Sequence, residues 1–190
     1  MLALAATLPM MAGRIDLTVG FGIVMWHILA ISLQVKYGVP WPIAILLVIA
    51  CAGFVGFLNG VLVEVAQVVS FVATLGTGTI LYALALWHAG GRQIVGDLPR
   101  GFIAINATSV FDIPIPAFYV LGLAIVLWIV SERLPLGRFI YAIGANEKAA
   151  ALNGIPVRRY VIGVFIASGV ITGFAGCVLG AKLRIGQANV

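Results

Sequence analysis

The chain has 190 residues, of which 63% are hydrophobic and only 9% are charged. One soluble core of this size cannot bury so much apolar surface, and the mean hydropathy of +1.17 indicates that the lipid bilayer is the solvent. The formal net charge of +5 does not predict nucleic-acid binding, because five of the eleven basic residues lie within residues 131–160, as positive-inside topology requires.

Apolar runs without charges predict the membrane spans, since about 20 such residues cross a hydrocarbon core of roughly 30 Å. The runs cover residues 17–35, 37–63, 65–91, 113–131 and 160–181, after a shorter opening run at 1–13. The opening run has no basic residue before its apolar core, so we interpret it as part of a span or half of a broken one, not as a signal peptide. We expect an all-α polytopic membrane protein, with five full spans and a partial N-terminal span in one domain over residues 1–190.

The first polar cluster lies at residues 13–20, Gly-Arg-Ile-Asp-Leu-Thr-Val-Gly. Asp16 and Thr18 can cap the start of the next helix, and the flanking glycines permit a bend. One interpretation is a capped helix break. The other is a discontinuous helix whose polar groups line a translocation path, because polar groups within a span are costly unless they have a function or a partner.

Two further polar groups fall inside apolar runs. Asn59 stands between Gly56 and Gly60 and can bond a neighbouring helix or face a pore. The third cluster carries Thr74, Thr77 and Thr79, whose hydroxyls more often bond their own helix than a substrate. The candidate residues of a translocation path are Asp16, Thr18, Asn59, Thr74 and Thr77.

The basic segment 131–160 predicts the orientation. It carries Arg133, Arg138, Lys148, Arg158 and Arg159 against Glu132 and Glu147, which favours the cytoplasmic side. Because each span crosses to the other side of the membrane, residues 92–112 and 34–42 are then expected outside, and residues 64–70 and 13–16 toward the inside. Segment 92–112 is balanced in charge, while 64–70 has no Lys or Arg to support its placement.

A short helix is predicted within residues 146–155. Asn146 is a good N-cap, Glu147 suits the first turn, and three alanines follow. Gly154 can adopt the left-handed conformation that ends a helix, and Pro156 prevents continuation. The small-residue face, including Ala150, can seat closely in a groove of a partner, although a helix lying at the lipid headgroups is an alternative.

Glycines recur on one helix face, at positions 169, 173, 176 and 180, and form a second small pair at 56 and 60. Such faces let helix backbones approach in lipid. Packing within the bundle is the favoured interpretation, and a dimer seam is the alternative.

The residues of common catalytic sites are missing from the sequence. None of the three lysines belongs to a phosphate-binding loop. His27 and His88 lie on different spans without a carboxylate at ligand spacing, and isolated histidines in spans are mostly packing residues. Cys51 and Cys177 have no CxxC spacing and are expected to be packed thiols. We therefore expect no enzyme activity and no metal site.

Four strings carry a family resemblance. They are the cluster at 13–20, Gly-x-x-Asn-Gly-x-Leu-Val at 56–63, Phe-Val-Ala-Thr-Leu-Gly-Thr at 71–77, and Gly-Arg-Phe-Ile-Tyr-Ala-Ile-Gly-Ala-Asn at 137–146, which continues as Ala-Ala-Ala-Leu-Asn-Gly-Ile at 149–155. In this order they resemble the permease subunit of bacterial ATP-binding-cassette (ABC) importers for simple sugars, of the ribose/xylose type. The chain departs from the family at Ala151, where arginine is usual, at Asn153, where serine is usual, and in residues 64–70, which often hold a basic, proline-containing stretch.

The resemblance implies an inner-membrane permease that works with a second permease copy, in a homodimer or a heterodimer, and with a periplasmic sugar-binding protein and cytoplasmic ATP-binding subunits. ATP and Mg²⁺ would be bound by those partners, so no cofactor is expected in this chain. Segment 132–159 would contain the helix that docks on the ATPase, with coupling residues Asn146, Glu147, Ala149, Ala150, Leu152, Asn153 and Gly154.

Two other classes stay open. A secondary transporter would couple to ions through carboxylates within its spans, a position that only Glu64 approaches in the sequence. Family members have about twice the predicted spans, so a truncated, non-transporting remnant is the other alternative.

Overall fold

The structure is a computed structural model that describes residues 1–110 and 112–187. Most of the described residues are helical. The helices are α1 (Leu2–Met11), α2 (Thr18–Val35), α3 (Trp41–Glu64), α4 (Ser70–Ala89), α5 (Arg100–Ala107), α6 (Ile115–Glu132), α7 (Pro135–Ala145), α8 (Glu147–Leu152) and α9 (Val157–Leu183), and an antiparallel pair joins β1 (Ser109–Val110) to β2 (Ile113–Pro114). Helices α2, α3, α4, α6 and α9 are long and apolar enough to cross a membrane. The prediction of an all-α polytopic protein with five spans and a shorter first helix is confirmed.

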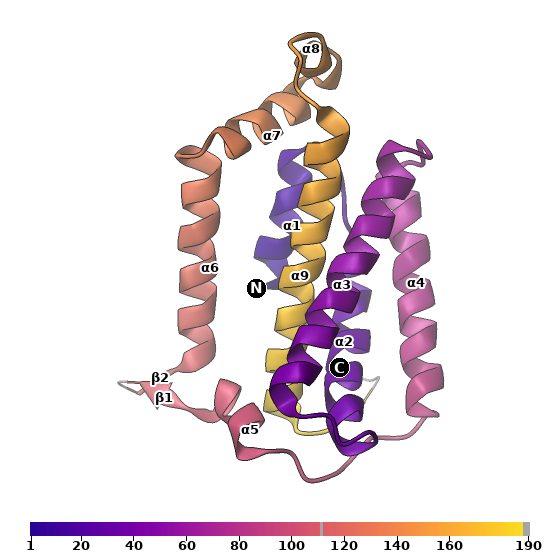
Figure 1. The fold of residues 1–190 in the computed structure, drawn as a ribbon, viewed down its shortest axis with the longest axis vertical. Helices are drawn as coiled ribbons and strands as arrows, with labels where there is room; N and C mark the ends of the chain where they lie inside the picture. Colours follow the sequence, from indigo (N-terminus) through magenta and orange to yellow (C-terminus); the bar gives the residue numbers. More distant parts are fainter. Residues whose placement is uncertain (111, 188–190) are drawn as a thin grey trace.

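Helix α9 is the central element of the bundle, with α3 packed along its length and α1 and α2 beside it (Figure 1). Its glycines allow this packing. A Cβ atom at Gly169 would collide with the carbonyl oxygen of Ala52, and one at Gly173 would lie 2.7 Å from the Ala52 Cβ. On α3, a Cβ at Gly60 would lie 2.8 Å from the Ile162 Cα. The glycine face therefore packs within the chain, as the favoured interpretation predicted.

Helix α6 stands apart from the bundle and has no buried residue (Figure 1). It is joined to the bundle by α7 at one end and by the hairpin and α5 at the other. Most apolar residues of α6 are left for lipid or protein outside the chain to cover; Leu127 packs against the bundle core, and Tyr119 meets the ring of Phe174 of α9 edge to face.

The connections between the helices lie at two opposite ends of the bundle. Helices α7 and α8 lie at the same end as the link between α3 and α4, while α5 and the hairpin lie at the other end (Figure 1). This arrangement is consistent with the alternation predicted for residues 131–160, 64–70 and 92–112. The assignment of either end to the cytoplasm stays a prediction.

The first helix is about half a span. Ten residues give roughly 15 Å of helix, and α1 ends beside α7, where residues 12–17 turn back toward the bundle interior. Gly13 has a φ of +71° at this turn. A Cβ at Gly144 of α7 would collide with the Met11 carbonyl oxygen, so the break and α7 are in backbone contact.

Three elements were not predicted. Helix α7 begins with Pro135 in its first turn, a common start signal, and buries Gly137, Ile140 and Ile143. The basic residues of the segment obscured this amphipathic pattern. Helix α5 and the small hairpin lie in segment 92–112 and its junction with α6, which the sequence indicated only as an external loop.

Candidate functional site

Residues 14–17 connect α1 to α2 without helical hydrogen bonds of their own. Irregular backbone inside a membrane protein needs other partners, and α4 supplies them. The backbone N–H of Ile15 donates to the Ser70 hydroxyl at 3.1 Å, and the N–H of Leu17 donates to the Thr74 hydroxyl at 3.1 Å. Thr74 in turn donates to the carbonyl oxygens of Ser70 and Ile15 at 2.8 and 3.3 Å. Thr74 therefore holds the break against α4.

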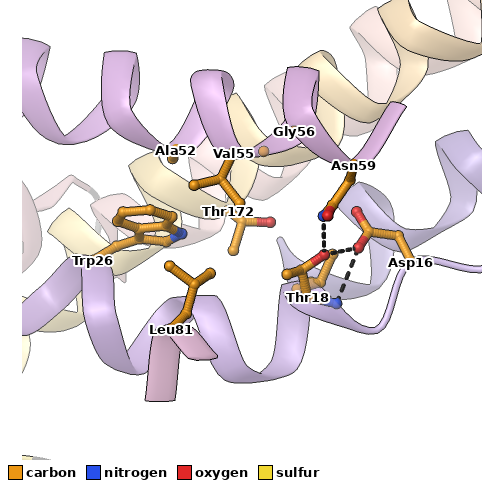
Figure 2. Close-up of a pocket in the computed structure, with 11 residues that line it drawn as sticks. Asp16, Thr18, Trp26, Ala52, Val55, Gly56, Asn59, Leu81 and Thr172 are labelled. Atoms are coloured by element: carbon orange, nitrogen blue, oxygen red, sulfur yellow. Dashed lines mark hydrogen bonds between the residues drawn. The ribbon is translucent and has the colours of Figure 1, made fainter. Parts of the chain in front are cut away.

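A buried polar network begins at Asp16, next to this break (Figure 2). One carboxylate oxygen accepts hydrogen bonds from the backbone N–H of Thr18, at 3.0 Å, and from the Thr18 hydroxyl. The other oxygen accepts from the Ser168 hydroxyl of α9 at 2.8 Å. Asp16 thus bonds Thr18, the first residue of α2, and ties it to α9.

The network continues through Asn59 of α3. Its amide nitrogen donates to the Thr18 hydroxyl at 2.7 Å, and its amide oxygen accepts from the Thr77 hydroxyl of α4 at 2.7 Å. Both polar ends of this amide are satisfied although the residue is almost completely buried. Four helices therefore meet at one hydrogen-bonded cluster.

A small cavity adjoins the network, lined on its polar side by Asp16, Thr18, Asn59 and Thr172 and closed by Trp26, Ala52 and Leu81 (Figure 2). Its volume is about 10 Å³. That is room for roughly one water molecule. In this conformation the cavity does not admit a sugar.

The structure brings all five candidate path residues together: Asp16, Thr18, Asn59 and Thr77 in the network, and Thr74 beside it. The sequence analysis missed Ser168 and Thr172 of α9, which are both buried. Their spacing of four, on the helix that carries the recurring glycines, is the signal that could have indicated them.

Helix α8 has the predicted start and stop. The Asn146 side chain accepts a hydrogen bond from the Ala149 backbone N–H at 3.0 Å, as an N-cap does. Gly154 has a φ of +81°, the left-handed conformation expected after the helix. The helix spans Glu147–Leu152, so it is shorter than the predicted segment.

The orientation of α8 contradicts the expectation that Ala150 faces a partner. Ala150 is 4% exposed and packs into the core of its own bundle with Leu8, Ile143 and Val157, so it does not belong to an outward docking face. A six-residue helix must bury one side to stay folded, and the small alanine fills that side. Leu152 is 90% exposed, and Ala149 and Asn153 are also exposed, so these residues form the outward side.

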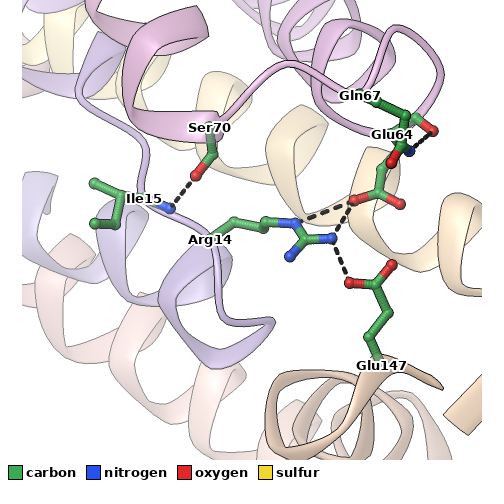
Figure 3. A network of polar contacts seen from close by, with 6 residues as sticks. All are labelled: Arg14, Ile15, Glu64, Gln67, Ser70 and Glu147. Atoms are coloured by element: carbon green, nitrogen blue, oxygen red, sulfur yellow. Dashed lines mark hydrogen bonds and ion pairs between the residues drawn. The ribbon is translucent and has the colours of Figure 1, made fainter. Parts of the chain in front are cut away.

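Arg14 joins three segments at this end of the bundle (Figure 3). Its guanidinium lies 2.8 Å from Glu64 at the end of α3 and 2.7 Å from Glu147 of α8. Partial burial would lower the pKa of Arg14, but hydrogen bonds and charge attraction from the two carboxylates outweigh it and raise the pKa. Glu64 is thus an ion-pair partner at a helix end.

The histidines and thiols take structural positions. His27 contacts the Ile23 carbonyl oxygen through its Nδ1 at 3.1 Å, and His88 contacts the Ser32 hydroxyl at 2.7 Å. Cys177 is buried, whereas Cys51 is exposed on α3, so the expectation of a packed thiol is wrong for Cys51. The described residues contain no cluster of metal-ligating side chains.

Five apolar spans, a shorter first helix that ends at a break, and a short helix between α7 and α9 define a multi-pass membrane protein. The chain belongs to the family described as "Branched-chain amino acid transport system / permease component", which matches residues 1–190. This finding confirms the permease resemblance of the four strings.

Curated relatives include sugar permeases. The chain is 34% identical over 169 residues to the D-allose transport system permease protein AlsC of Escherichia coli, covering 89% of the chain and 52% of that protein. It is 32% identical over 188 residues to the ribose import permease protein RbsC of Bacillus subtilis, covering 98% and 58%. The autoinducer 2 import system permease protein LsrD of E. coli is 29% identical over 182 residues, covering 93% and 55%. The chain spans about half the length of these relatives, and no solved structure matches it.

Proposed function

We propose that the chain forms part of the permease subunit of an ABC importer that moves a monosaccharide across the bacterial inner membrane. Cytoplasmic ATP-binding subunits supply the energy and bind ATP and Mg²⁺, a periplasmic binding protein delivers the sugar, and a second permease copy completes the pore. The family and the names of the relatives support this proposal.

The geometry of α8 is the single observation that carries the mechanism. A capped two-turn helix lies between α7 and α9, buries Ala150 in the bundle and exposes Leu152 and Lys148. An apolar side chain that is 90% exposed suits insertion into a groove of a partner. Because α8 is packed on the bundle through Ala150, force applied to its outer side reaches the spans.

We also propose that the buried network lies on the translocation path. A cavity with room for about one water cannot pass a sugar, so passage beside Asp16 requires α2, α3 and α9 to separate. The network would then be the closed position of the path, released when the ATP-binding subunits move α8.

An ion-coupled secondary transporter is the second candidate, and Asp16 is the observation that favours it. Asp16 and Glu64 are both buried, but Glu64 pairs with Arg14, whereas Asp16 accepts hydrogen bonds from Thr18 and Ser168. Uptake by whole cells with a maintained ion gradient but depleted ATP separates the two functions. The ABC proposal requires that uptake stops.

The docking role is tested with Leu152→Asp in the full-length permease. Burying an unpaired charge at a protein contact costs several kcal/mol in order of magnitude, so we expect ATP-binding subunits to copurify at least about tenfold less. Lys148→Ala tests the alternative, a helix held at anionic headgroups, and should leave copurification nearly unchanged. Normal copurification and uptake with Leu152→Asp would contradict the docking role of α8.

A further inference from the structure

The two carboxylates that pair with Arg14 differ in burial. Glu64 is 2% exposed and receives two hydrogen bonds from Arg14, from Nε at 3.1 Å and from Nη2 at 2.8 Å. Glu147 is 45% exposed and receives one, from Nη2 at 2.7 Å. A buried carboxylate depends strongly on its partner, whereas an exposed pair is weak and screened by salt. Arg14 is therefore fixed to α3 and only loosely attached to α8.

The backbone on either side of Arg14 leads to the buried network. Ile15 is bonded to Ser70 of α4 (Figure 3), and Asp16 is bonded to Ser168 of α9. Arg14 is thus two residues from the carboxylate that joins α2 and α9. A change in the position of α8 at Glu147 can reach Asp16 through this short extended segment.

We propose that Arg14 is a positioning residue that links α8 to the helix break: its contact with Glu147 is a releasable latch, and its contact with Glu64 is the anchor. With the latch closed, residues 14–17 are held against α4 and the network stays shut. When α8 is displaced, Glu147 leaves Arg14 and the segment loosens. Only the cause of the α8 displacement rests on the proposed function. The latch itself is a property of the chain.

Hydrogen exchange measures the latch in the full-length permease without any ATP-binding subunit. In Glu147→Gln, the amides of Ile15, Leu17 and Thr18 should exchange about two- to fivefold faster, the range that corresponds to an exposed ion pair. Glu132→Gln is the matched control, because Glu132 is an exposed acid of the same segment with no ion pair in the described part of the chain. Equal exchange in the two variants would overturn the latch, and neither exposed substitution should affect folding.

A double-mutant comparison separates the latch from a general loosening of α8. In an Arg14→Gln/Glu64→Gln background, the added Glu147→Gln should have no further effect on the amides of residues 15–18. A persisting effect would show that Glu147 acts without Arg14 and would overturn the proposal.

Transport supplies the last readout. If the ABC proposal holds, Glu147→Gln should lower the sugar transported per ATP hydrolysed, while Glu132→Gln should not. If the wild-type permease transports without ATP, the proposed function fails, and the exchange experiment still decides the latch. An unchanged transport ratio in Glu147→Gln, with a working ATP-dependent wild type, would also count against the latch.

Discussion

At the scale of single residues, Asp16 shows how a polar group is accommodated inside an apolar bundle. Its carboxylate accepts hydrogen bonds from Thr18 and Ser168, and Thr18 accepts a bond from Asn59. The cost of burying these groups is offset only while all of them are paired. The cluster therefore specifies how α2, α3 and α9 meet.

Removing the carboxylate should lower stability. Asp16→Ala leaves the Ser168 hydroxyl and the Thr18 backbone N–H without partners, at about 1–3 kcal/mol for each buried group. We expect a clearly lower thermal unfolding midpoint for the full-length protein in detergent. Thr79→Ala is the control, because the Thr79 hydroxyl is exposed and bonds only its own helix. An equal midpoint in the two variants would show that the network does not hold the bundle.

Arg14→Ala isolates the buried end of the ion pair. It leaves Glu64 buried without its cation, which costs about 3–5 kcal/mol. The double variant Arg14→Ala/Glu64→Gln should recover most of the unfolding free energy, since the uncompensated charge is gone. Arg138→Ala, an exposed arginine without an ion pair among the described residues, should change it little. Failure of the double variant to recover would assign the loss to packing of the Arg14 side chain.

At the scale of elements, close contact between α3 and α9 depends on the absence of side chains. Gly169 lies against the Ala52 carbonyl and Gly56 against the Phe165 carbonyl, so neither site has room for a methyl group. Gly163, on the same helix α9, has nothing within 4 Å of its missing Cβ. Gly163 lies off the face formed by positions 169, 173, 176 and 180, as its spacing indicates.

This contrast gives a matched pair of substitutions. Gly169→Ala should destabilise the full-length protein by about 1–3 kcal/mol, the usual cost of overpacking. Gly163→Ala should be neutral or slightly stabilising, because alanine favours helix. Unfolding in detergent with added denaturing surfactant measures both. Similar effects of the two substitutions would contradict the packing assigned to α9.

At the scale of the whole molecule, the open question is which end faces the cytoplasm. The end with α7 and α8 carries the five basic residues of segment 131–160, whereas segment 92–112, at the end with α5, has two basic and two acidic residues. Charge bias of this kind orients membrane proteins. The end with α8 is therefore expected inside.

Thiol labelling of intact cells tests the orientation. In a background without Cys51 and Cys177, a cysteine at Asp97 should react with an impermeant reagent, and one at Lys148 should react only after the cells are opened. Both positions are in connections outside the five spans. Labelling at position 148 alone in intact cells would reverse the topology.

The sequence by itself determined the spans, the helix break and the caps of α8, because these depend on local physics. Charge-free runs of span length require helices in lipid, and Asn146 and Gly154 act on their immediate neighbours. Polarity within a span also indicated most members of the buried network, but not Ser168. It could not show whether those groups bond to one another or face a path.

Only the tertiary structure decided which residues meet and which face outward. Ala150 lies inward and Leu152 outward because α8 docks through the small side chain onto a core that includes Leu8, which is remote in sequence. Arg14, Glu64 and Glu147 are likewise far apart along the chain and are joined only when α1, α3 and α8 end on the same side of the bundle. Long-range charge pairing has no periodic signal in a sequence, so it appears only when the helices are placed.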